Sequence, residues 1–125
     1  MDQRRYERGL AKLKEIDGEV GERVIQSLKN IAPDLATYTI EFPFGDVYSR
    51  PELDLKSREI ATVAALTAMG HAAPQLKVHI NAALNVGCTH NEIIEIIIQM
   101  AVYAGFPAAL NAAFIAEEVF NERSD

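Results

Sequence analysis

The sequence predicts an all-α protein that folds as a single domain over residues 1–125, with five to seven helices and a central antiparallel helical hairpin. Apolar residues make up 49% of the 125 residues, which is enough for one core of ordinary size. Alanine is abundant, runs of β-branched residues are few, and turn clusters at the spacing of strands are missing. These observations favour helices over strands.

The first thirty residues are predicted to form two helices. Residues 2–16 are rich in charged side chains and carry apolar residues at roughly helical spacing, which is typical of a surface helix. Asp17 and Gly18 break that helix. A second helix is expected over residues 21–30, and its inward-facing side chains are predicted to be Val24, Ile25 and Leu28.

Pro33 marks the first turn of a third helix, which Pro43 and Gly45 are expected to bend or end. Residues 42–54 are then predicted to form a loop that can hold a short helical turn. This loop holds the aromatic rings of Phe44 and Tyr48 together with the guanidinium of Arg50. Two interpretations stay open: these side chains line the edge of a ligand pocket, or the two rings plug the end of the core.

A nearly all-apolar helix is predicted over residues 55–69, with Asp54 as a good N-cap. After its first turn it has almost no polar face, so we expect it to be buried all round. Gly70 ends it, and the next helix is expected over residues 74–86. The inward stripe of that second helix is formed by Leu76, His79, Ile80, Ala83 and Leu84.

The C-terminal part is predicted to hold two more apolar helices. Residues 89–92, Thr-His-Asn-Glu, form a capping box at the start of the first of them. The uncharged stretch 96–116 is long enough to suggest a membrane span, but Gly105 and Pro107 interrupt it and leave each half too short. So much apolar helix surface in a short chain predicts self-association.

The charge and cysteine content exclude several classes of function. The net charge is −6 without a basic stripe, so nucleic acid and anionic membranes are poor partners. One cysteine, Cys88, allows neither an intrachain disulfide nor a CxxC redox motif. The N-terminal residues are charged from the second position onward and show no signal-peptide pattern, so the cytoplasm is the expected location. Neither a His-x3-His pair nor an acidic cluster at ligand spacing is present, so no metal site is predicted.

Glu59 and His79 are the strongest candidates for catalysis, because a tight hairpin can bring two such groups together on an apolar wall. His79 is either a core histidine bonded to a backbone carbonyl or a general acid or base that lines a pocket. Glu59 is either a surface carboxylate that complements the helix dipole or the group that orients His79.

Four further side chains are weaker candidates for a site. Arg50 and Arg58 can hold a substrate carboxylate through two hydrogen bonds, or can be exposed or paired with an acid such as Asp46. His71, at the bend of the hairpin, is either a second acid–base group or an exposed linker residue. Cys88 precedes a helix N-terminus, which lowers a thiol pKa, but it occupies an apolar staple position and is expected to serve packing.

Two stretches of the sequence resemble the carboxymuconolactone decarboxylase family. They are LKVHINAALNVG, which contains His79, and VYAGFPAALNA over residues 102–112, and the similarity extends over roughly residues 38–123. The resemblance implies the helical fold of the alkylhydroperoxidase-D enzymes, within a peroxiredoxin-like superfamily, and a ring-like homohexamer. In the peroxidase branch the working residues are a Glu, a CxxC pair and a His. Glu59 and His79 match two of these, but no cysteine stands near residues 71–74, where the pair belongs.

The resemblance therefore implies decarboxylation of 4-carboxymuconolactone or a related small carboxylated lactone, without a cofactor. In this reading His79 donates the proton or binds the oxyanion, and Glu59 orients it. Arg50 or Arg58 binds a substrate carboxylate. The remaining candidates for the substrate site are Tyr48, His71 and Tyr103. The alternative is a peroxidase-like relative or a non-catalytic protein that binds small acids, and the missing CxxC disfavours it.

Overall fold

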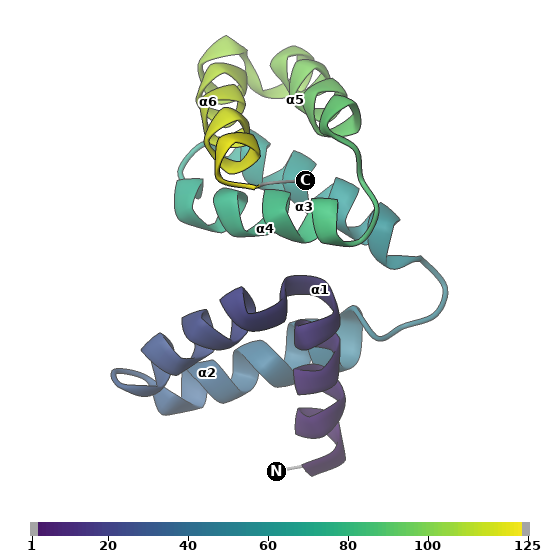
Figure 1. Cartoon of the computed structure of the whole chain (residues 1–125), viewed down its shortest axis with the longest axis vertical. Helices are drawn as coiled ribbons and strands as arrows, with labels where there is room; N and C mark the ends of the chain where they lie inside the picture. The colour runs from purple at the N-terminus through teal and green to yellow at the C-terminus, as the bar shows by residue number, and fades with distance from the viewer. Residues whose placement is uncertain (1–2, 124–125) are drawn as a thin grey trace. The chain divides into compact units, whose positions relative to one another are not determined.

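The computed structural model describes residues 3–123, and within that range it contains only helices and the connections between them. In chain order the helices are α1 (Gln3–Lys29), α2 (Pro33–Thr39), the π-helix η1 (Ile40–Val47), α3 (Leu55–Met69), α4 (Ala73–Asn85), α5 (His90–Ala104) and α6 (Phe106–Glu122) (Figure 1). The predicted all-α fold class is confirmed. Among the helices of residues 3–123, none combines the length and the apolar content that crossing a bilayer requires.

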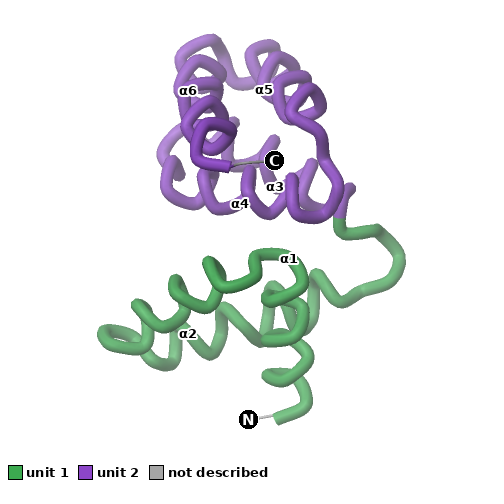
Figure 2. The backbone as a smooth tube through the Cα atoms, in the orientation of Figure 1, with its two compact units in different colours: residues 1–55 green, residues 56–125 purple. Residues whose placement is uncertain are grey.

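The chain divides into two compact units, Met1–Leu55 and Lys56–Asp125, which are green and purple in Figure 2. The first unit holds α1, α2 and η1, and the second holds α3 to α6. Each unit buries apolar side chains of its own. The expectation of one folding domain over the whole chain stays a prediction.

A kink at Gly18 divides α1 into two arms. Gly18 has φ 57° and ψ −138°, a conformation open to glycine, and it stands where the sequence predicts the break. The first arm buries Ile16 and the second buries Ile25. Val24, which we expected to face inward, is 43% exposed, so that prediction is wrong. Adjacent residues of a helix point about 100° apart. The buried face of this arm is narrow, so Ile25 lies on it and its neighbour Val24 points toward solvent.

The segment that we predicted as a loop begins as a helix. Ile40–Val47 form η1, which continues α2 directly, and Pro43 and Gly45 lie inside it rather than at its end. The N–H of Tyr48 donates to the carbonyl of Pro43 at 2.7 Å, the five-residue spacing of a π-turn. The local breaking tendency of proline is overridden because η1 packs on α1 and buries Phe44 there.

The close approach of α1 and η1 depends on Gly9. A Cβ atom there would overlap the carbonyl oxygen of Ile40 and stand 2.9 Å from its carbon. We therefore expect Gly9→Ala to lower the free energy of unfolding by about 1–3 kcal/mol, the usual cost of overpacking. Helix propensity alone would instead raise it by about 1 kcal/mol. Urea denaturation followed by circular dichroism measures the difference.

The matched control for Gly9→Ala is Ala11→Gly, at an exposed position of the same arm. The Ala11→Gly substitution changes helix propensity without creating a steric clash. We expect it to lower the free energy of unfolding by about 1 kcal/mol. A Gly9→Ala protein that is more stable than the wild type would contradict the tight α1–η1 contact.

In the second unit α5 and α6 lie side by side and α6 packs on α4 (Figure 1). Their shared core is formed by Val63, Leu76, Ile80, Ala83, Cys88, Ile93, Ile97, Ala109, Ala112, Ala116 and Val119. Lys77 joins α4 to α6 because its Nζ lies 2.7 Å from Glu118 and 3.0 Å from Glu122. Small alanines on α6 let the helices approach closely.

The helix α3 has the predicted bounds but not the predicted environment. Its fully buried residues are Glu59, Val63 and Thr67, while Met69 is 51% exposed. The expectation that α3 is buried all round is therefore wrong for the single chain. A four-residue spacing places the three buried side chains on one face, and the exposed residues Ala61, Ala65, Ala68 and Met69 lie off that face.

Two helix ends follow the sequence signals closely. The N–H of Glu92 donates to Thr89 Oγ1 at 3.0 Å, and the N–H of Thr89 donates to the Glu92 carboxylate at 2.9 Å, so the predicted capping box is confirmed. Gly105, with φ 94°, ends α5 and precedes α6. The predicted interruption of the uncharged stretch is thus confirmed too.

Candidate active site

Glu59 on α3 and His79 on α4 are joined by a hydrogen bond. Nδ1 of His79 lies 2.9 Å from Oε1 of Glu59. An ionised carboxylate only accepts hydrogen bonds, so a carboxylate at Glu59 pairs with the imidazole tautomer or cation that carries a hydrogen on Nδ1. The contact that the hairpin predicts between these residues is confirmed.

Helical periodicity explains why these two side chains meet. Glu59, Val63 and Thr67 are spaced by four residues and form the buried face of α3. His79 lies within the stripe of α4 that also contains the buried Leu76 and Ile80. Each helix therefore carries one titratable group on an otherwise mostly apolar inner face.

The carboxylate of Glu59 is unusual in its burial. The side chain is 0% exposed, and Oε2 has no hydrogen-bond partner among residues 3–123. The interpretation of Glu59 as a surface group near a helix start is therefore wrong. Burying a carboxylate whose second oxygen is unpaired costs stability, because the lost hydration is only partly replaced. Such groups are functional-site candidates.

His79 is held at the boundary between this buried carboxylate and the surface. Its side chain is 21% exposed. The contact of Nδ1 with a carboxylate and the partial exposure of the ring favour the interpretation of His79 as a general acid or base over that of a core histidine bonded to a backbone carbonyl. A ring oriented in this way has Nε2 as its second proton-carrying atom, on the opposite edge.

Three other predicted site residues belong to the second unit. Arg58 precedes Glu59 on α3 and is partly buried. His71 is exposed in the connection between α3 and α4, and Tyr103 is 78% exposed near the end of α5. No hydrogen bond within residues 3–123 joins His71 or Tyr103 to the Glu59–His79 pair. Their roles stay predictions.

Tyr48 and Arg50 belong to the first unit. Tyr48 is partly buried, and its ring centroid lies 5.5 Å from that of the buried Phe44. This contact favours the interpretation of Phe44 as a plug of the core of its own unit. Arg50 is exposed. The substrate-binding roles of Tyr48 and Arg50 stay predictions.

Cys88 is a packing residue. It is 5% exposed and belongs to the core of the second unit. Burial, together with the nearby carboxylate of Glu92, raises the pKa of the Cys88 thiol. A raised pKa is the opposite of what an activated thiol needs, so the helix N-terminus does not make Cys88 a nucleophile.

This environment predicts slow thiol chemistry. Alkylation of Cys88 by iodoacetamide at pH 7 should be at least about tenfold slower than that of glutathione, since the thiol is buried and protonated. The rate should rise as the pH is raised toward the elevated pKa. The same protein in urea is the control, and its thiol should react at the ordinary rate. Alkylation of the folded protein faster than glutathione would contradict this assignment.

Sequence reasoning missed a buried acid in the first unit. Glu41 is 2% exposed in η1, and its nearest cation is Arg5, with Nη1 at 3.8 Å from Oε1. The Nε of Arg5 also donates to both oxygens of Asp46 at 2.9 Å, which holds the pKa of that carboxyl below its usual value. The available signal was a single acid within the apolar run from Ile40 to Phe44.

Within residues 3–123, no three His, Cys, Asp or Glu side chains stand close enough together to hold a metal ion.

Comparison with known proteins places the chain in a family. Residues 33–118 match the sequence model of the carboxymuconolactone decarboxylase family. A 4-carboxymuconolactone decarboxylase from Acinetobacter baylyi is 36% identical over 122 residues, which cover 97% of this chain and 90% of that protein. A nitrosuccinic acid decarboxylase from Metarhizium robertsii is 30% identical over 131 residues, which cover 100% of this chain and 87% of that protein. Given these matches, which include both helices of the Glu59–His79 pair, the chain belongs to the carboxymuconolactone decarboxylase family.

Proposed function

We propose that this protein is a cofactor-independent decarboxylase of 4-carboxymuconolactone or a related small carboxylated lactone. The named activities of two relatives support a decarboxylase. The observation that carries the proposal is the buried carboxylate of Glu59, bonded at 2.9 Å to the partly exposed imidazole of His79. Such a pair supplies the proton transfer that this reaction needs.

The reaction requires an electron sink and a proton. Cleavage of the bond between the ring and the carboxylate releases CO2, and the bonding electrons move through the ring double bond into the lactone carbonyl. The resulting oxyanion is a dienolate, which then takes a proton at carbon. Because the conjugated lactone is its own electron sink, the protein must only stabilise the developing charge and deliver that proton.

His79 is the proposed proton donor. In its protonated form the ring donates Nδ1–H to Glu59, and Nε2–H is the proton that passes to the dienolate carbon. The ring is then neutral and regains a proton from solvent, which its partial exposure allows. The Glu59 carboxylate stabilises the imidazolium and fixes the ring orientation.

The substrate carboxylate that is retained needs a cationic partner. Arg58, adjacent to Glu59 on α3, is the proposed partner, and Arg50 is the second candidate. Tyr48, His71 and Tyr103 remain proposed wall residues. The nitrosuccinic acid acted on by one relative is also a dicarboxylate with an electron sink, its nitro group, beside a carboxylate. We therefore include small dicarboxylates with such a sink in the proposed substrate class.

A spectrophotometric assay of 4-carboxymuconolactone decarboxylation tests the proposal, with nitrosuccinate assayed in parallel by CO2 release. Turnover of either substrate without added metal or cofactor is the expected result. Cys88→Ala should turn over at the wild-type rate, since that thiol is a packing residue. Absence of turnover on both substrates by a folded protein would refute the proposed substrate class.

We also propose that the protein is a cytoplasmic homohexamer. The support is an exposed apolar stripe on α5 and α6, formed by Ile98, Val102, Tyr103, Phe106, Leu110 and Phe114, each more than half exposed in the single chain. Exposed apolar surface of this extent is typical of an interface between subunits. Native mass spectrometry should give six times the chain mass of 13.8 kDa. A monomeric mass at micromolar concentration would contradict the proposal.

A further inference from the structure

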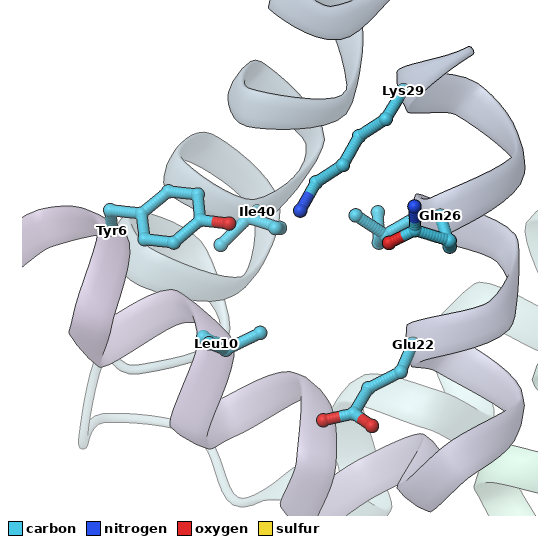
Figure 3. A pocket seen from close by; sticks show the side chains of 7 residues that line it. Tyr6, Leu10, Glu22, Gln26, Lys29 and Ile40 are labelled. Carbon is cyan, nitrogen blue, oxygen red and sulfur yellow. The ribbon is translucent and has the colours of Figure 1, made fainter.

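The first unit contains a pocket that the proposed reaction does not use. Its volume is about 230 Å³, and it lies between the two arms of α1 and the start of η1 (Figure 3). Its lining residues are Tyr6, Leu10, Glu22, Ile25, Gln26, Lys29 and Ile40. The kink at Gly18 creates this space, because it folds the second arm of α1 back toward the first.

The interior of the pocket is apolar. Ile25 and Ile40 are 5% and 0% exposed, and Leu10 is partly buried beside them. These side chains can cover the apolar body of a small ligand. A space of about 230 Å³ is smaller than the sites of drug-sized ligands, so the ligand must be compact.

Three hydrogen-bonding side chains surround that interior, and the described part of the chain supplies no side-chain partner for them. The Tyr6 hydroxyl, the Gln26 amide and the Lys29 ammonium make no side-chain hydrogen bond or ion pair within residues 3–123. Figure 3 shows the hydroxyl of Tyr6 and the ammonium of Lys29 turned toward the open space of the pocket. A lysine in the last turn of a helix commonly complements the dipole, but that role does not require the side chain to lie over a pocket.

The remaining polar group limits the charge of the ligand. The carboxylate of Glu22 also points into the space, and it pairs with Lys14 at 3.2 Å on the rim (Figure 3). Among residues 3–123, Lys29 is the cation without an ion pair that faces the pocket, and the Glu22 carboxylate would repel a second anionic group. A ligand with a single negative charge therefore fits better than a dianion.

We propose that this pocket binds a small monocarboxylate with a compact apolar body. Lys29 and Tyr6 bind the carboxylate, Gln26 contributes an amide hydrogen bond, and the apolar residues cover the rest. The pocket is a binding site, and its ligand class differs from the dicarboxylates proposed for the Glu59–His79 pair.

Fluorine NMR of the full chain with 4-fluorobenzoate as probe tests this proposal. The wild type should bind the probe, and the neutral 4-fluorobenzamide should bind at least about tenfold more weakly, as expected when a charge-assisted hydrogen bond is lost. Lys29→Met should weaken the binding of 4-fluorobenzoate by a similar factor. Tyr6→Phe should weaken it by a few-fold, and thermal melting should show that both variants fold.

Lys12→Met is the matched control, because it removes one lysine charge from α1 outside the pocket lining and should leave binding unchanged. His79→Ala separates the two sites, and it should also leave probe binding unchanged. Binding that is lost in His79→Ala but kept in Lys29→Met would overturn the proposal. A wild-type protein that does not bind the probe, for instance because a second copy fills the pocket, would overturn it as well.

Discussion

The His79→Ala variant is expected to lose nearly all decarboxylase turnover, with kcat lowered by about 10²–10⁴-fold, the usual contribution of a positioned general acid. The reason is the position of the ring. Its Nδ1 is held by the buried Glu59 at 2.9 Å, so Nε2 is the atom that can deliver a proton to the dienolate carbon. Steady-state kinetics with 4-carboxymuconolactone measures the loss.

The matched control for this variant is His90→Ala. His90 is also a histidine of the second unit, but its ring stacks on Phe120 with centroids 4.0 Å apart. Its removal should leave kcat within about twofold of the wild type, since general acid catalysis needs contact with the substrate. If His79→Ala folds and turns over within tenfold of the wild type, the proton-donor role is wrong.

Replacement of Glu59 by Gln is expected to separate activity from stability. Gln keeps the shape of the side chain and one acceptor oxygen for Nδ1–H, but it cannot stabilise an imidazolium by charge. We expect kcat to fall by about 10²-fold or more with little change in KM, because the interaction is strongest when the ring is protonated.

The free energy of unfolding of Glu59→Gln should stay within about 1 kcal/mol of the wild type or rise, because the variant removes a buried charge whose Oε2 has no partner among the described residues. Urea denaturation measures this quantity. A purely structural Glu59 would show the reverse, a loss of stability with unchanged turnover of the protein that remains folded.

Glu59→Asp gives a further comparison for the positioning role. The charge is kept, but the shorter side chain cannot span the 2.9 Å contact to Nδ1 without a shift of α3. Turnover should therefore fall although the charge is present. Wild-type turnover in Glu59→Asp would mean that charge alone matters, and that the hydrogen bond does not orient the ring.

Much of this fold could be predicted from the sequence because its signals are local. The Thr89–Glu92 capping box, the break at Gly18 and the end of α5 at Gly105 each depend on residues within one turn of the position concerned. The bounds of α3 follow from the same kind of signal. The exception is η1, in which proline and glycine stand inside a helix because packing against α1 outweighs their local preferences.

The candidate site was only partly accessible from the sequence. Spacing placed His79 on the inner stripe of α4, and the predicted hairpin singled out Glu59 as the group that could meet it. The complete burial of that carboxylate was not predictable, because a residue near a helix start is exposed or buried according to what lies opposite. The pocket between the arms of α1 was missed for a similar reason, since its lining residues come from positions up to 34 residues apart (from Tyr6 to Ile40).

The sequence by itself determined the helical class, most helix ends and the identity of the two titratable groups on apolar faces. Only the tertiary structure decided that Glu59 is buried against His79, that α3 keeps an exposed apolar side, and that Lys29 and Tyr6 face one space. The physical reason is range. Caps and periodicity act within a helical turn, whereas burial and the pairing of charges depend on residues that are distant along the chain.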